Sequence, residues 1–223
     1  ARSVRVLSHV GGHGWIEAAR EADIDGPRKG DGGHAESSPA QPAGLTILTF
    51  NVWFDRKQRR ERFKVLMDII FARAPAVACF QEVCAEFLDL LLAEPRIREH
   101  YLITDPAAAT WDAWYGVLTM IHRSTALTEG CPLPVRSLVA TYQTFNPTLT
   151  KLGRGLLAVH VPGVVALGNV HLESPVRGVT AAHRAEQLAM ASDILRSFAP
   201  RNVLAGDFNF CSPSEDATIV DTA

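Results

Sequence analysis

Gly206-Asp207-Phe208-Asn209 follows Asn202–Ala205, a short apolar run with the composition of a buried strand. An acid and an amide, one residue apart, therefore stand where a strand ends. Period-two geometry predicts that the side chains of Asp207 and Asn209 point to the same side. A strand end is a rigid base from which polar groups can be aimed at a substrate. The competing interpretation of an isolated G-D-x-N is a turn that merely closes a strand.

The same arrangement recurs at three other predicted strand ends. The strands and the polar residues that follow them are Leu45–Phe50 with Asn51, Ala76–Phe80 with Glu82, and Val164–Val170 with His171. Each residue alone has an ordinary alternative, as a turn former, a surface charge or a core histidine. The recurrence at four strand ends favours a shared site.

A hydrolytic phosphodiesterase site requires side chains of these types. One carboxylate holds a hard divalent cation such as Mg²⁺, which prefers oxygen ligands and keeps several waters. A second carboxylate orients and deprotonates the attacking water. Amides and imidazoles donate hydrogen bonds to the phosphoryl oxygens as charge develops.

Composition and the positions of Gly- and Pro-rich turns predict the organisation of the chain. The 223 residues carry a formal net charge of −2, so nothing in the overall charge attracts nucleic acid. No apolar run is long enough to span a membrane. Residues 1–44 are rich in Gly and Pro turns and predict a disordered or loosely attached leader. Residues 45–223 then form the folded domain.

Helices are predicted between the strands. Phe63, Leu66, Met67 and Ile70 fall on one helical face, while 85–93 and 180–198 carry similar apolar patterns. The charged run from Arg56 to Lys64 is interpreted mainly as the solvated side of the first helix. None of the four cysteines forms a C-x-x-C pair, which argues against a zinc site. This cysteine usage suits an intracellular protein, for which the nucleus is one candidate compartment.

Four ordered motifs resemble those of the endonuclease/exonuclease/phosphatase superfamily. They are T-F-N-V-W (49–53), F-Q-E-V (80–83), H-L-E-S (171–174) and G-D-F-N (206–209). Within the superfamily the chain is most similar to the tyrosyl-DNA phosphodiesterase 2 (TDP2) branch. Tyr115 in its strand, Gly153-Arg154 before the hairpin, and Arg177-Gly178 after H-L-E-S carry this finer resemblance.

The resemblance implies an α+β fold, a four-layer α/β/β/α sandwich of two mixed sheets with helices outside. It also implies the role of each residue. Glu82 would bind Mg²⁺, with Mn²⁺ as the alternative, and Asp207 would activate water. Asn51, Asn209 and His171 would hold the phosphate. Tyr115, Arg154 and Ser174 would line the side of the leaving tyrosyl group or DNA end.

The implied reaction is hydrolysis of 5′-phosphotyrosyl bonds at DNA ends, which removes trapped topoisomerase during DNA repair. Other nuclease or phosphatase activities of the superfamily, and a non-catalytic remnant, are the alternatives. The superfamily pattern also includes a later Ser-Asp-His motif, which this sequence does not contain. The resemblance therefore implies that residues 45–223 are a catalytic domain truncated at its C-terminal side, with an exposed sheet edge.

Overall fold

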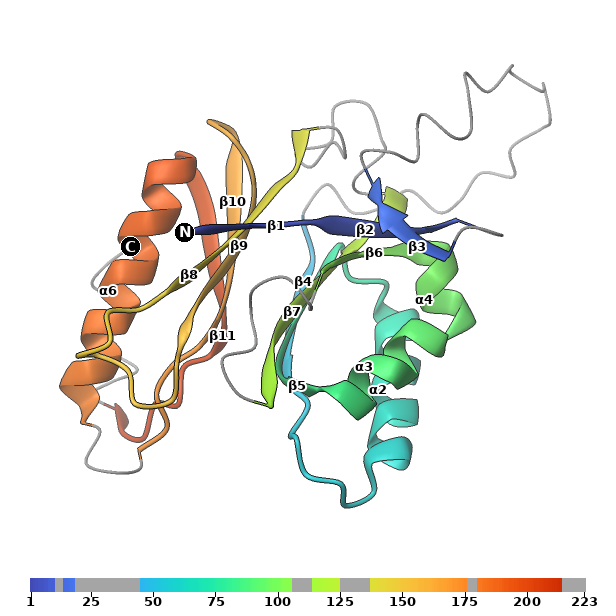
Figure 1. Cartoon of the computed structure of the whole chain (residues 1–223), viewed down its shortest axis with the longest axis horizontal. Coiled ribbons are helices and arrows are strands. Elements are labelled where there is room, and N and C mark those ends of the chain that lie inside the picture. Colours follow the sequence, from blue (N-terminus) through green and yellow to red (C-terminus); the bar gives the residue numbers. More distant parts are fainter. Residues whose placement is uncertain (11–13, 19–44, 106–113, 125–136, 176–179, 214–223) are drawn as a thin grey trace.

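Two β-sheets face each other, and helices cover the outer face of each sheet (Figure 1). The structure is a computed structural model that describes residues 1–10, 14–18, 45–105, 114–124, 137–175 and 180–213. The five-stranded sheet has the order β1 (Arg2–Val4), β8 (Val139–Thr144), β9 (Gly155–Val161), β10 (Val165–His171) and β11 (Arg201–Asp207). The six-stranded sheet has the order β3 (Gly14–Glu17), β2 (Val6–Val10), β6 (Tyr101–Thr104), β7 (Tyr115–His122), β5 (Val77–Cys84) and β4 (Ile47–Asn51).

The helices form the two outer layers. On the six-stranded sheet lie α2 (Arg59–Arg73), α3 (Ala85–Ala93) and α4 (Pro95–His100), while α6 (Ala181–Phe198) covers the five-stranded sheet (Figure 1). The predicted four-layer sandwich is confirmed. None of the helices that the structure describes combines the length and apolar character needed to cross a bilayer.

Strand periodicity explains how the hairpin β9–β10 serves two cores at once. All seven residues of β9 are buried. Leu157 and Val159 belong to the core between the sheets, whereas Leu156 and Ala158 belong to the core under α6. Alternate residues of one strand thus pack against opposite layers, as the period of two requires.

Two parallel strand pairs bring the predicted strand ends together. All other pairings among the described strands are antiparallel, but β4 runs parallel to β5 and β10 runs parallel to β11. Asn51 is therefore level with Gln81, and His171 with Asp207. Because β11 also packs against β4 and β5, the four ends meet at one place. Within the described part of the chain, β4 is an edge strand of the six-stranded sheet and β11 an edge strand of the five-stranded sheet.

The prediction of a loose leader over residues 1–44 is wrong for its first part. β1 pairs with β8 in one sheet, and β2 pairs with β3 and β6 in the other. Val4 and Val6 are buried in the core between the sheets, and the Arg5 side chain bonds to Asp105. The alternation of Val4, Val6 and Ser8 was hidden by the glycines that follow. Residues 19–44 lie outside the described residues.

A buried amide network joins the two sheets next to the strand ends. Asn169 in β10 donates to the backbone oxygens of Phe80 and Leu118 across the interface, at 3.2 and 3.0 Å. Its Oδ1 accepts from Gln81 Nε2 at 2.8 Å. Asn169 is fully buried, and it lies two residues before His171 on the same strand. The network fixes β10 against β5, so that His171 and Glu82 keep their relative positions.

Replacement of Asn169 by leucine is expected to destabilise the protein by about 3 kcal/mol, because several buried polar groups lose their partners at once. Chemical denaturation measures this change. The exposed substitution Asn202→Leu is the matched control and should cost less than about 0.5 kcal/mol. A loss for Asn169→Leu no larger than that of the control would contradict a structural role for the network.

Candidate active site

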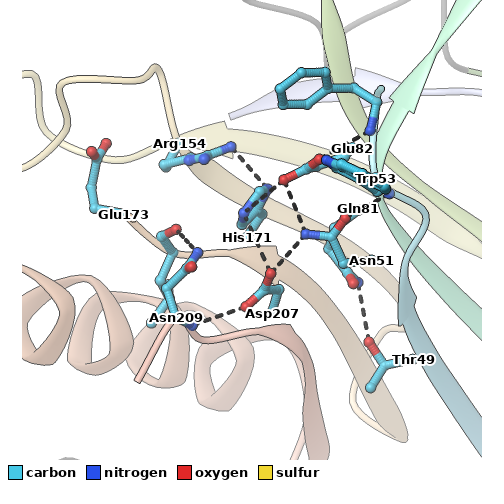
Figure 2. Close-up of polar contacts among 12 residues, drawn as sticks. Thr49, Asn51, Trp53, Gln81, Glu82, Arg154, His171, Glu173, Asp207 and Asn209 are labelled. Atoms are coloured by element: carbon cyan, nitrogen blue, oxygen red, sulfur yellow. Dashed lines mark hydrogen bonds and ion pairs between the residues drawn. The ribbon is translucent and has the colours of Figure 1, made fainter. Parts of the chain in front are cut away.

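The amide of Asn51 stands between two carboxylates that come from different sheets. Asn51 Nδ2 donates to Glu82 Oε1 at 3.1 Å and to Asp207 Oδ2 at 2.8 Å (Figure 2). Asn51 Oδ1 accepts from the backbone N of Trp53 at 2.9 Å, which fixes the amide orientation. Glu82 and Asp207, here called the carboxylate pair, are thus held together by one amide nitrogen. Two distant parts of the sequence meet at this point.

Glu82 occupies a β-bulge rather than a simple strand end. The register between β5 and β7 shifts between Phe80 and Val83, and Glu82 has a φ of 59°. A left-handed conformation at a non-glycine residue is uncommon and concentrates at functional sites. The backbone N of Phe54 donates to Glu82 Oε2 at 3.1 Å. The bulge therefore turns the carboxylate toward the five-stranded sheet, where Asp207 lies.

His171 is held as a neutral ring with a defined tautomer. Arg154 Nη1 lies 2.9 Å from His171 Nδ1, and a guanidinium can only donate. Nδ1 is therefore the acceptor, and the proton is on Nε2. Nε2 lies 3.6 Å from Asp207 Oδ2 and 3.9 Å from Glu82 Oε1. Figure 2 shows the ring between Arg154 and the carboxylate pair.

The environment keeps His171 uncharged. Burial and the neighbouring Arg154 lower the pKa of His171 to about 3, against the opposing effect of Asp207. The ring is thus neutral at physiological pH, and its Nε2–H is a hydrogen-bond donor directed at the carboxylate pair. A phosphoryl oxygen between the carboxylates would receive this hydrogen bond.

Asp207 and Asn209 are joined by a turn and not by strand periodicity, since β11 ends at Asp207. The strand periodicity on which their expected alignment was based is therefore absent, although both residues line the same cavity. The backbone N of Asn209 donates to Asp207 Oδ1 at 3.0 Å, and Asn209 Nδ2 donates to the oxygen of Leu172 at 2.9 Å. Gly206 is required before them: its φ is 153°, and an added Cβ would lie 2.0 Å from Val170 O.

Tyr115, Arg154 and Ser174, which the resemblance assigned to the leaving-group side, lie at three different places around the site. The ring of Tyr115 lies 6.3 Å from that of His171, and Arg154 Cζ lies 5.5 Å from the centre of the Tyr115 ring. Arg154 is buried behind His171 and 6% exposed. Ser174 is half-buried in the segment after β10, and no contact is recorded between Ser174 and the carboxylate pair within the described residues. Arg177-Gly178 lies outside the described residues.

The sequence interpretation missed Glu173, which supports the site from behind. This carboxylate is fully buried, and its Oε1 accepts from the backbone N of Lys151 and Leu152 at 2.9 and 3.0 Å. Thr150 also donates to it and in turn accepts from the backbone N of Arg154 at 2.7 Å. Glu173 thus fixes the loop that carries Arg154. A carboxylate directly after an apolar strand, in H-L-E-S, was the available signal.

A cavity of about 530 Å³ opens beside Asp207. Its lining includes Asn51, Asp207, Asn209 and Cys211. Cys211 is exposed, whereas Cys79 and Cys84 are buried. Burial raises the pKa of the Cys79 thiol to about 12, so that this thiol stays protonated. Only an accessible thiolate reacts readily with alkylating reagents.

A maleimide is therefore expected to modify Cys211 and to remove most of the activity, because the adduct fills the cavity two residues from Asn209. The test uses a Cys131→Ser background, in which mass spectrometry should find one modified thiol before unfolding. Addition of Cys211→Ser should abolish both labelling and inhibition. Full activity after complete labelling of Cys211 would show that the cavity is not used.

The carboxylate pair fits a divalent cation. Both carboxylates face neutral partners: the Asn51 amide, the Phe54 backbone N and the uncharged His171. Among the described residues, no three His, Cys, Asp or Glu side chains form a complete metal-ligating group. Mg²⁺ suits such a site because it takes one or two carboxylates and fills its remaining positions with water and substrate phosphate.

A family model described as the Endonuclease/Exonuclease/phosphatase family matches residues 48–220. The chain belongs to this family, whose fold is that of hydrolases acting on phosphate esters. None of the curated proteins matches the sequence significantly.

Solved structures show the same fold at low sequence identity. A humanized D. rerio TDP2 matches with a TM-score of 0.58 and 21% identity over 78% of this chain and 66% of that chain. TDP2 from C. elegans matches at 0.56 and 18%, over 77% and 49%. ANGEL2, a 2′,3′-cyclic phosphatase, matches at 0.53 and 18%, over 76% and 55%. The chain thus spans about half to two thirds of these proteins.

Proposed function

We propose that this protein is a metal-dependent phosphodiesterase that hydrolyses 5′-phosphotyrosyl bonds at DNA ends. One observation carries the proposal: the Asn51 amide bridges Glu82 and Asp207, and the Nε2–H of a neutral His171 faces both carboxylates. This arrangement combines an anionic cation site, a base and two hydrogen-bond donors around one space. Each of these is needed to displace an oxygen from a phosphoryl group.

Each residue then has a separate task. Glu82 holds Mg²⁺, which supplies neutralisation of phosphate charge when it is bound. Asp207 orients a water and takes its proton, while the water oxygen bonds to phosphorus and the bond to the leaving oxygen breaks. His171 donates to a phosphoryl oxygen. Asn51 holds the carboxylate pair beside the phosphate through its Nδ2, and Asn209 holds Asp207 in position through its backbone N. Arg154 sets the tautomer of His171 from behind.

The choice of substrate rests on the TDP2 likeness and on the surroundings of the site. A D. rerio TDP2 similar to this chain, at a TM-score of 0.57 and 20% identity, was solved with a single-strand DNA product. Tyr115 also places an aromatic ring beside His171, next to a guanidinium, as a surface for a phenolic leaving group. Activity at DNA ends would place the protein inside the cell, including the nucleus.

Release of tyrosine from a 5′-phosphotyrosyl oligonucleotide in Mg²⁺ tests this function. Parallel substrates are a 2′,3′-cyclic phosphate, which the match to ANGEL2 makes relevant, an abasic-site duplex, a 3′-ended RNA and a lipid phosphate. The proposal expects the phosphotyrosyl ester to have the highest kcat/KM and no turnover in EDTA. Faster hydrolysis of another substrate would assign that activity to the protein instead. No turnover of any substrate would favour a non-catalytic remnant.

A further inference from the structure

A second hollow, of about 460 Å³, lies next to Glu82, and its lining includes Phe54, Arg59 and Trp114. Phe54 connects this hollow to the carboxylate pair. Its backbone N donates to Glu82 Oε2, and its ring contacts Trp114 in the lining of the hollow. None of the roles assigned above uses this space. Trp114 is 59% exposed, although tryptophan usually buries most of its surface.

Three aromatic rings form a continuous wall from the reactive cluster into this hollow. Phe54 stacks on Tyr115 at 5.1 Å between centroids, and Trp114 meets the edges of Phe54 and Tyr115 at 4.3 and 5.1 Å. These spacings fall in the range of favourable aromatic contacts. Phe54, Trp114 and Tyr115, here called the aromatic shelf, begin beside His171 and end at an exposed indole.

The in-line geometry of phosphoryl transfer places the leaving group on the side of the aromatic shelf. Asp207 and Glu82 accept from the same Asn51 Nδ2, and in Figure 2 Asp207 lies below this nitrogen and Glu82 above it. In phosphoryl transfer the attacking and leaving oxygens are roughly in line. A water held by Asp207 therefore expels its leaving group toward Glu82, where Phe54 and Tyr115 lie.

The charges around the hollow favour a polypeptide over a nucleic acid strand. Its lining includes two acids, Asp55 and Glu86, and two bases, Arg56 and Arg59. Both guanidiniums contact Glu86, at 3.1 and 3.3 Å. The hollow thus lacks the surplus of positive charge that tracks a phosphate backbone. Balanced charges beside an aromatic wall suit a peptide instead.

We propose, on the basis of the proposed function, that this hollow is a leaving-group subsite in which Trp114 packs against the polypeptide attached to the scissile tyrosine. The contact exists in the bound substrate as well as in the transition state. Such uniform binding lowers KM and leaves kcat unchanged. Trp114 is therefore a specificity-determining residue for peptide-linked over alkyl-linked phosphodiesters.

The test compares two esters of one oligonucleotide, a 5′-phosphotyrosyl peptide ester and a 5′-phosphomethyl ester. Trp114→Ala is expected to raise KM for the peptide ester about 10-fold, the loss of one aromatic contact, with kcat within about 2-fold. The methyl ester should show no change. Trp114→Phe should recover most of the lost affinity. Val164→Ala, at an exposed apolar residue in the turn before β10, is the control.

Two results would overturn the assignment of Trp114 to a peptide subsite. Equal losses on both esters would show a structural role for Trp114 and overturn the subsite. A loss that disappears when the terminal nucleotide is made abasic would assign Trp114 to base stacking instead. Binding of the labelled peptide ester to Asp207→Asn, with and without Trp114→Ala, reports on the subsite without turnover. The subsite can thus stand if the wild-type protein hydrolyses nothing, and fail while hydrolysis persists.

Discussion

Replacement of Asp207 by asparagine is expected to lower kcat about 1,000-fold, near the middle of the range for loss of a general base together with its hold on water. The substitution keeps the shape of the side chain. Its oxygen can still accept from Asn51 Nδ2 or from the backbone N of Asn209. Its NH₂ then faces the other donor, which should cost about 1–3 kcal/mol of stability. The loss of kcat should appear under conditions in which the variant is fully folded.

Steady-state kinetics on the phosphotyrosyl oligonucleotide measures this effect. Asp193→Asn is the matched control, because Asp193 is an exposed acid on α6 that pairs with the exposed Arg196. The control should retain full activity. If Asp207→Asn kept more than about a tenth of the wild-type kcat, Asp207 would not be the base.

Replacement of Glu82 by glutamine is expected to raise the Mg²⁺ concentration for half-maximal activity at least 100-fold. Even residues that only support a metal ligand change affinity by about 10- to 100-fold, and a ligand itself should matter more. The new amide also turns its NH₂ toward a donor, either Asn51 Nδ2 or the Phe54 backbone N. That conflict should cost about 1–3 kcal/mol of stability.

Calorimetric titration with Mg²⁺ and with Mn²⁺ measures the change in metal affinity, and chemical denaturation measures the change in stability. Glu99→Gln, an exposed acid on α4, serves as the control for loss of one negative charge. Wild-type metal affinity in Glu82→Gln, together with normal stability, would remove Glu82 from the cation site. Lower stability with unchanged metal affinity would leave Glu82 a structural role only.

The strand ends were predictable because their signals are local. Apolar runs of about five residues, followed by Asn51, His171 or Asp207, read directly as strands that end in polar groups. The family motifs then predicted the sandwich, which the structure confirms. The helices over 85–93 and 180–198 also agree closely with α3 and α6.

The parts that were missed depend on contacts distant in sequence. The bulge at Glu82 and the turn that joins Asp207 to Asn209 need φ values near 59° and 52°, which residue type does not signal. The burial of Arg154 next to His171 also depends on distant residues, because Glu173 and Thr150 fix the loop that carries it. The roles of these residues in catalysis stay predictions.

A crystal structure of Asp207→Asn with Mn²⁺ and an uncleaved 5′-phosphotyrosyl oligonucleotide is the most direct test of the central claim. That claim is the convergence of four strand ends on one phosphoryl group. We expect an anomalous manganese peak bonded to the Glu82 carboxylate, with the scissile phosphorus between Glu82 and residue 207 and within reach of His171 Nε2. Manganese bound elsewhere, or a phosphoryl group outside this space, would contradict the account.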